Sequence, residues 1–187
     1  LVRLARSEGE LTGRKAAVAG LLLSVFFGGI AAGHWVTHRR LLQGEARKVG
    51  MAWFDHMAKR RPQLAHQLTL GPDARSSDED SWAPYREDRR LHEQLEKQLS
   101  EKLFRVLLAL GEKATVRYYA TEVIDKTGGD EVVVMLFVVT FEGDAGKTSF
   151  LTRVAVKREP TKIEGREPWR IIGLTGGVRP AWEEPLE

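Results

Sequence analysis

The sequence predicts an α+β protein in which an N-terminal transmembrane helix is followed by helices packed on a curved four-stranded antiparallel sheet. Three observations lead to this prediction. An uncharged, mostly apolar run occupies Ala16–Val36. Apolar residues then recur at helical spacing as far as Gly111. From residue 114 onward the spacing becomes that of strands separated by turn-forming residues.

The apolar run is long enough to cross a membrane once, because about 20 helical residues span the ~30 Å hydrocarbon core. Arg14 and Lys15 precede it, Arg39 and Arg40 follow it, and Trp35 lies where interfacial aromatic residues are common. We therefore expect a single-pass protein of a bacterial inner membrane or an equivalent membrane. Basic residues are equally frequent near both ends of the run, so the positive-inside rule leaves the side of the soluble domain open.

A secretory signal peptide is the alternative interpretation of this run. Ala31–Gly33 would serve as a small-residue cleavage site, but the run is longer than the usual signal core of about 7–15 residues. We expect the segment to be kept as an anchor. The chain begins with Leu1 rather than Met, which is typical of an incomplete or trimmed N-terminus.

Small residues in the run predict that the helix docks against another membrane helix. Small side chains let two backbones approach closely, and such packing drives helix association in lipid. The alternative is that Gly and Ala are simply frequent in membrane helices. The predicted docking residues are Ala16, Gly20, Ser24, Gly28 and Ala32, which recur every fourth residue, together with Gly29 and Gly33 beside them.

His34 and His38 are spaced i,i+4 at the end of the run and could ligate a haem or chlorin metal, since imidazole is a common neutral ligand. The alternative is a pair of interfacial histidines that contact lipid headgroups. A bare pair without further ligands is a weak signal, so no cofactor is expected. The chain has no cysteine, which excludes disulfides, thiolate metal sites and cysteine nucleophiles.

Positive charge is concentrated next to the apolar run. The chain has a formal net charge of +3, but residues 37–61 alone contain seven basic and two acidic residues. Such a segment is attracted to anionic headgroups by about 1 kcal/mol per basic residue near the surface. Nucleic acid is not an expected partner, because no stacking aromatics are interleaved with these charges. The predicted membrane-surface residues are Arg39, Arg40, Arg47, Lys48, Lys59, Arg60 and Arg61.

The predicted domains are an N-terminal flank (1–15), the transmembrane helix (16–36), a soluble α+β domain (37–178) and a C-terminal tail (179–187). In the soluble domain, helical spacing and the Pro and Gly punctuation predict helices over 41–60, from Pro62 to Gly71 and over 91–110, with a loop over 72–84. The leucine stripe over 91–110 favours a helix packed on a sheet, with a coiled-coil seam as the alternative.

Alternating residues and intervening turns predict strands over 116–124, 131–141, 148–157 and 169–174. The segment 131–141 has apolar residues on both faces, as a central strand covered on both faces would have. The segment 148–157 instead places Arg153 and Lys157 on one face and apolar residues on the other.

Three stretches resemble the nuclear transport factor 2 superfamily, the cone-shaped fold shared with ketosteroid isomerase. They are Ala46–Leu70, which contains AWFDHMAKRRPQLAHQLTL, the strand VVVMLFVVTFEG, and the closing REPWRIIGLTGG. The likeness covers about residues 42–178 and is a pattern of elements rather than a signature motif.

A membrane helix ahead of such a domain looks like the inner-membrane scaffold subunits of bacterial conjugation and type IV secretion, and like membrane subunits of mitochondrial protein import. A weaker likeness is to cytochrome-oxidase assembly factors. In the secretion and import subunits the domain is a binding and assembly module. The resemblance therefore implies a non-catalytic accessory or scaffold subunit whose partners are other membrane-protein subunits or a second copy of the chain.

The resemblance also leaves alternatives. The family's cone can hold a small apolar ligand, and its catalytic relatives place an Asp and a Tyr inside it. An isomerase-like or ligand-binding pocket is one alternative, and a cofactor-bearing subunit of a redox or photosynthetic complex, using His34 and His38, is another. The candidate pocket residues are Trp53, Asp55, His66 and Tyr119, with His56 and Tyr118 as further candidates; strand neighbours Tyr118 and Tyr119 must face opposite sides.

Catalysis is not expected from the motifs of this chain. The inward-facing positions of 131–141 offer only Val, Met, Leu and Phe, whereas the isomerase relatives carry acid/base carboxylates on their strands. The sequence has no recognisable phosphate-binding loop, zinc-ligand spacing or Ser/His/Asp arrangement.

Overall fold

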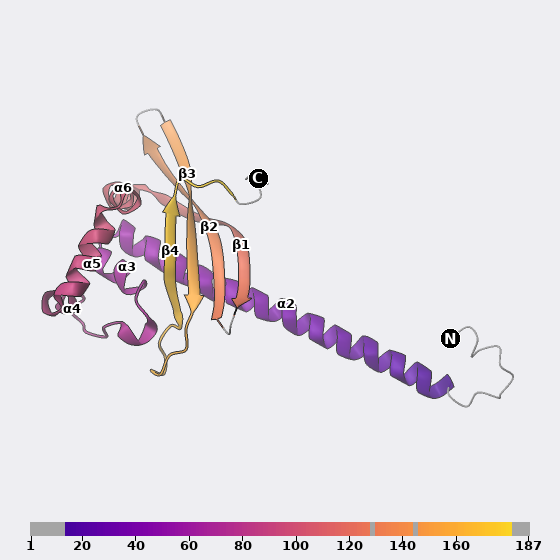
Figure 1. Ribbon diagram of the computed structural model, residues 1–187. Helices are drawn as coiled ribbons and strands as arrows, with labels where there is room; N and C mark the ends of the chain where they lie inside the picture. Colours follow the sequence, from indigo (N-terminus) through magenta and orange to yellow (C-terminus); the bar gives the residue numbers. More distant parts are fainter. Residues whose placement is uncertain (1–13, 128–129, 144–145, 181–187) are drawn as a thin grey trace. The chain divides into compact units, whose positions relative to one another are not determined.

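The computed structural model describes residues 14–127, 130–143 and 146–180, and the chain divides into two compact units, Leu1–Leu41 and Leu42–Glu187 (Figure 1). Helix α2 (Arg14–Ala58) begins in the first unit and ends in the second. The predicted membrane segment and the predicted helix over 41–60 therefore belong to one helix. Gly44 and Gly50 do not interrupt it, because a glycine costs only about 1 kcal/mol within a helix.

Helix α2 ends in a turn that requires a left-handed residue. Arg60 has φ 56°, its N–H donates to the Met57 carbonyl (3.1 Å), and the Arg61 N–H donates to the His56 carbonyl (2.8 Å). These two bonds form a Schellman motif, which satisfies carbonyls at the helix end. The next elements are α3 (Pro62–Gln67), the 3-10 turn η1 (Pro72–Ala74) and α4 (Ala83–Glu87).

The leucine stripe over 91–110 forms two helices rather than the predicted one, α5 (Arg89–Ser100) and α6 (Lys102–Leu110), followed by the 3-10 turn η2 (Gly111–Lys113). Glu101 is extended (φ −68°, ψ 143°) and breaks the helix. The break gives the two halves independent directions, so that α6 can bury Phe104 and Leu107 in the main core.

The sheet is an antiparallel meander in the order β1-β2-β3-β4, which confirms the predicted α+β class. Its strands are somewhat longer than predicted, because the hairpins stay paired up to their turns; Gly143 pairs with Gly146. The strands are β1 (Thr115–Thr127), β2 (Asp130–Gly143), β3 (Gly146–Arg158) and β4 (Trp169–Gly176).

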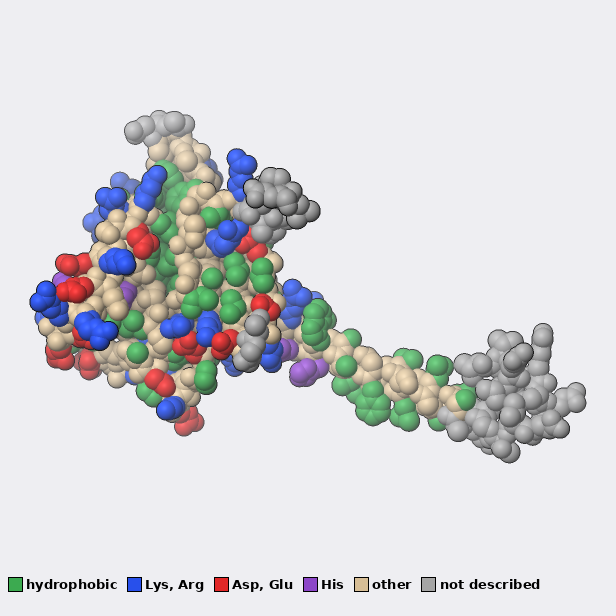
Figure 2. All heavy atoms as spheres, viewed as in Figure 1, with side chains coloured by type: hydrophobic (Ala, Val, Ile, Leu, Met, Phe, Trp, Pro, Cys, Tyr) green, Lys and Arg blue, Asp and Glu red, His purple; other side chains and the backbone are tan. Residues whose placement is uncertain are grey.

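One face of the sheet carries the core. Residues from α2, α3 and α6 pack there against the inward-facing side chains of β2, β3 and β4, and Trp53, Phe137 and Trp169 are fully buried. The other face is open: Tyr119, Val123 and Ile172 are exposed on it, and hydrophobic side chains are visible among charged ones in Figure 2.

The central strand β2 differs in part from its prediction. Its burial alternates, with every inward-facing residue from Val133 to Val139 buried and most outward-facing ones half-buried. Leu136 is the exception, because it faces outward and is still fully buried. The helices of the domain contribute to the core on one face only, so the apolar residues on the other face are incompletely covered.

Candidate functional site

The apolar part of α2 is long and apolar enough to cross a membrane once, as judged by length and composition, and a signal sequence would meet the same criterion. In its most apolar stretch, no residue is buried among the residues that the structure describes. Exposed side chains such as Leu22, Phe26 and Trp35 are more than half accessible. Apolar surface of this extent needs lipid or another protein to cover it.

Among the described residues, the glycines of the predicted docking stripe have no close neighbour outside their own helix. A Cβ atom added at Gly20, Gly28, Gly29 or Gly33 would meet no other atom within 4 Å. Ser24 Oγ donates to the Gly20 carbonyl (2.9 Å), which satisfies its hydroxyl without an outside partner. Ala32 is exposed, and the side chain of Ala16 lies outside the described residues.

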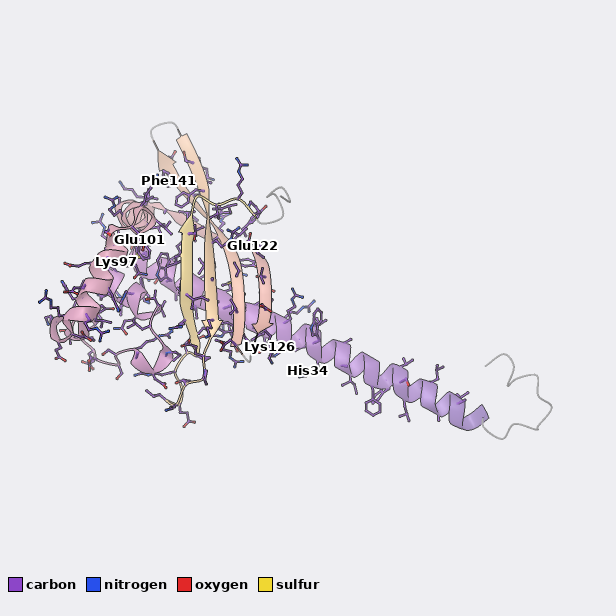
Figure 3. All side chains as sticks on the ribbon, viewed as in Figure 1. His34, Lys97, Glu101, Glu122, Lys126 and Phe141 are labelled. Carbon is purple, nitrogen blue, oxygen red and sulfur yellow. The ribbon has the colours of Figure 1, made fainter. Side chains whose placement is uncertain are left out.

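Trp35, Arg39 and Arg40 form an aromatic and basic cluster at the end of the run, which we call the collar. The Arg39 guanidinium lies 5.3 Å from the centroid of the Trp35 ring, and Arg40 is exposed. The rings of His34 and His38 are nearly parallel, with centroids 6.2 Å apart; His34 is labelled in Figure 3. Among the described residues, no group of three or more His, Cys, Asp or Glu could hold a metal ion.

The predicted membrane-surface residues within Leu42–Glu187 differ in their contacts. The Arg47 guanidinium lies 4.7 Å from the centroid of the Tyr118 ring, and Lys59 pairs with Asp55 at 2.8 Å. Arg60 forms the turn that ends α2. Lys48 and Arg61 are exposed.

The four candidate pocket residues lie in different environments. Trp53 is fully buried in the core, where its ring makes an edge contact with Phe104. Asp55 is exposed, and Tyr119 is 52% exposed on the open face of the sheet. His66 is buried in α3. The structure does not bring these four side chains to one site.

Side chains fill the face of the sheet that packs against the helices. In a cone-shaped fold, a small ligand would lie on this concave face. Phe54 packs on Phe137 with ring centroids 5.2 Å apart, and Met57 and Met135 are buried beside them in the same core. Tyr118 also faces this side, where its hydroxyl accepts a bond from Gln43 Nε2 (2.6 Å) and lies 2.8 Å from Thr121 Oγ1. This hydrogen-bonded network joins α2 to β1.

His66 belongs to a network that sequence reasoning missed. The Tyr85 hydroxyl donates to the Gln63 carbonyl (2.9 Å) and lies 2.9 Å from His66 Nδ1. The hydroxyl proton is used by the carbonyl, so Nδ1 must carry its own proton and donate to Tyr85. Burial lowers the pKa of His66 and raises the pKa of Tyr85 to about 12. Burial therefore favours the neutral form of both groups, and the hydrogen bonds tie α4 to α3.

His56 also lies in a partly buried position. Burial is the main cause that lowers its pKa, the Asp55 carboxylate opposes this effect, and Arg61 and Lys59 reinforce it. Its Nδ1 atom is buried without a hydrogen-bond partner among the described residues.

An ion pair on the open face of the sheet was also missed. Arg153 donates from Nε to Glu122 Oε2 (2.6 Å) and from Nη2 to Glu122 Oε1 (3.0 Å). The Glu122 side chain, labelled in Figure 3, is 2% exposed. The pair bridges β1 and β3 across Leu136, which lies between Ala120 and Arg153 in the strand register, and this explains the burial of Leu136. Alternation predicts the face of Arg153, but only the register reveals its partner.

Comparisons of the chain with protein-family models, with curated proteins and with solved structures gave no match.

Proposed function

We propose that this chain is a single-pass membrane protein that acts as a non-catalytic accessory or scaffold subunit of a larger membrane complex. The observation that carries the proposal is the helical run Ala16–Val36, which has no Asp, Glu, Lys or Arg and whose most apolar stretch has no residue buried among those that the structure describes. Such a helix needs a lipid or protein environment.

The glycines of the run support docking against another helix. None of those described has a neighbour within 4 Å of an added Cβ, so the fold of this chain does not require them to be small. Close approach of a second membrane helix would require small residues at these positions. The partner is another subunit or a second copy of the chain.

The collar of Trp35, Arg39 and Arg40 supports a location at the headgroup layer. Trp prefers this layer, and Arg is attracted to anionic lipid there. The soluble domain is proposed to be of the nuclear transport factor 2 type, on the order of its helices and strands. Its filled concave face favours binding through outer surfaces over binding of a small ligand inside.

The first experiment is to solubilise the native membrane in mild detergent, isolate the chain and identify the attached subunits by mass spectrometry. A stoichiometric set of membrane subunits is expected. Recovery of the chain alone would contradict the subunit proposal. N-terminal sequencing of the same material separates the two interpretations of the run, since cleavage at Ala31–Gly33 would leave a chain that begins close to His34.

A substitution series tests the docking stripe. The triple change Gly20→Leu, Gly28→Leu and Gly33→Leu should abolish co-isolation, because the added side chains hold the helices apart. The matched control is Ala19→Leu with Ile30→Phe, which adds volume on the side of the helix that carries none of the predicted docking residues and should leave co-isolation unchanged. Equal effects of the two variants would contradict a specific docking face.

A further inference from the structure

One edge of the sheet, along β4, is only partly closed by the chain. At its start the Trp169 carbonyl accepts a bond from Arg75, and the Ile171 N–H donates to the Leu68 carbonyl (2.8 Å). The C=O group of Trp169 and the N–H group of Ile171 therefore point away from β3. Beyond Ile171 the strand continues as far as Gly176.

The outward-facing groups of the remaining strand follow from the register. The Gly177 N–H donates to the Leu151 carbonyl of β3 (2.8 Å), so Gly177 points toward the sheet. In an antiparallel ladder the inward and outward residues alternate, which directs the N–H and C=O groups of Leu174 and Gly176 away from β3. Within the described part of the chain, no hydrogen bond from outside the sheet reaches these two residues. An unpaired edge of this kind is a template for another strand.

Two grooves run beside this edge, and both are lined by Glu101 and Leu174. One, of about 430 Å³, is lined mainly by polar and β4 residues, including Thr69, Gln98 and Arg170. The other, of about 390 Å³, is more apolar and is lined by Leu103, Val106 and Phe150 together with the end of β4. Glu101, labelled in Figure 3, lies at the break between α5 and α6.

The two edge strands of the sheet differ in how they are protected. β1 carries the exposed charged residues Arg117, Asp125 and Lys126, which discourage the addition of a further strand. The segment 172–177 has no charged residue, and three of its six residues are glycines. The space beside Gly176 is used by α6, because an added Cβ there would lie 2.6 Å from Leu103 Cδ1. The β4 edge therefore lacks the charged residues that protect the β1 edge.

The charges around the grooves favour an uncharged occupant. Glu101 and Arg170 both line the polar groove, and Glu101 and Lys102 both line the apolar one. These opposite charges balance within the lining, so neither an acidic nor a basic peptide is favoured. The apolar groove instead complements an apolar side chain.

We propose that the β4 edge binds an extended, uncharged segment of a partner polypeptide as a fifth strand. Backbone groups of the segment bond to Leu174 and Gly176, and one of its alternate apolar side chains fills the groove formed by Leu103, Val106 and Phe150. This site lies within Leu42–Glu187 and goes beyond the proposed role of the anchor, so it does not depend on the docking stripe.

The test uses the full chain in detergent micelles with the fluorescent peptide Thr-Val-Thr-Leu-Thr-Val-Thr. We expect saturable binding below about 1 mM and slower amide hydrogen exchange at Leu174 and Gly176 in the bound state. Val106→Glu places a charge in the apolar groove and should weaken binding about tenfold or more. The matched control is Ala109→Glu, an exposed position on the same helix that should leave binding unchanged.

A second pair of variants leaves α6 unchanged, so a folding defect in α6 cannot explain their effect on binding. Ile172→Lys adds an edge charge on β4, and Val123→Lys adds the same charge at a similarly exposed position (47% and 44%) on β1. Only the β4 variant should lose binding. The proposal would be overturned if the peptide did not bind, or if it bound without slowing amide exchange at Leu174 and Gly176. Equal losses of binding in both members of a pair of variants would overturn it as well. Concentration-dependent protection without peptide would overturn it in favour of a second copy of the chain at this edge.

Discussion

The ring of Phe137 occupies the space that a side chain at position 50 would need. A Cβ atom built on Gly50 would lie 2.7 Å from Phe137 Cζ, closer than any normal carbon contact. Gly50 is on α2, and Phe137 is a fully buried residue on the central strand β2. The absent side chain therefore sets how closely the helix packs on the sheet.

Gly50→Ala should destabilise the protein although alanine is the better helix former. Alanine gains about 1 kcal/mol in helix propensity, but overlap with a buried ring costs about 1–3 kcal/mol. We expect a net loss in the free energy of unfolding. Gly44→Ala is the matched control on the same helix, because its Cβ would meet nothing within 4 Å; it should stabilise by about 0.5–1 kcal/mol. Denaturant unfolding followed by tryptophan fluorescence measures both, and a stabilised Gly50→Ala would show that Phe137 moves aside.

Arg60→Gly should stabilise the protein. Arg60 has φ 56° at the end of α2, a conformation that costs a non-glycine residue about 1–2 kcal/mol. Glycine removes this strain but adds freedom to the unfolded chain, so the expected net gain is about 1 kcal/mol. Arg61, one residue further on, does not have a left-handed backbone conformation. Arg61→Gly should therefore not stabilise the protein. Thermal unfolding of the two variants makes the comparison, and a similar shift in both would argue against backbone strain.

The Arg153–Glu122 pair should show asymmetric effects on stability. Arg153→Met removes the bidentate partner of a carboxylate that is 2% exposed, and breaking a buried pair in this way costs about 3–5 kcal/mol. Glu122→Gln should cost less, because the Arg153 side chain is 28% exposed and can gain water. A double-mutant cycle on unfolding free energies measures the coupling. Additive effects would mean that the pair contributes nothing beyond its separate members.

Stability should fall on acidification because of His66. Burial holds the pKa of His66 in the folded protein below its ordinary value of 6.5. Below pH 6.5 the unfolded chain binds the proton first, so the stabilising effect is complete above this pH and is lost as the pH falls toward the folded-state pKa. His66→Gln should flatten this part of the pH profile of the denaturation midpoint.

His56 provides the comparison for that experiment. Its pKa is also lowered, with burial as the first cause and the Asp55 carboxylate acting in the opposite direction. His56→Gln should therefore remove a separate share of the pH dependence, and the double variant should remove both. A profile unchanged in His66→Gln would mean that the buried ring is not the titrating group.

Much of the fold was predictable because it depends on local patterns. The uncharged run, the strand alternation and the turn residues established the α+β class and the order of the meander, as β1 to β4 confirm. Pro62 correctly marked the start of α3. The break at Glu101 was not predicted, because the leucine spacing on both sides of it continues without interruption.

Candidate site residues were harder to predict than elements. Trp53 and Asp55 were both predicted to line one pocket, but Asp55 is exposed and Trp53 lies in the core. Tyr118 and Tyr119 were known to face opposite sides of a strand, and only the packed helices decided that Tyr118 faces inward. The pairing of Glu122 with Arg153 depends on a register across three strands, which spacing along the chain does not encode.

The sequence by itself determined the anchor-like run, the basic segment after it, the element types and their order, because these follow from composition and periodicity over neighbouring residues. Only the tertiary structure decided that the core face of the sheet is filled and that His66 bonds to Tyr85. It also decided that, within the described part of the chain, the β4 edge has backbone groups without a partner beside a groove. Those features arise where residues far apart in the chain compete for the same space or the same hydrogen bond, and that competition is settled only when all the elements pack together.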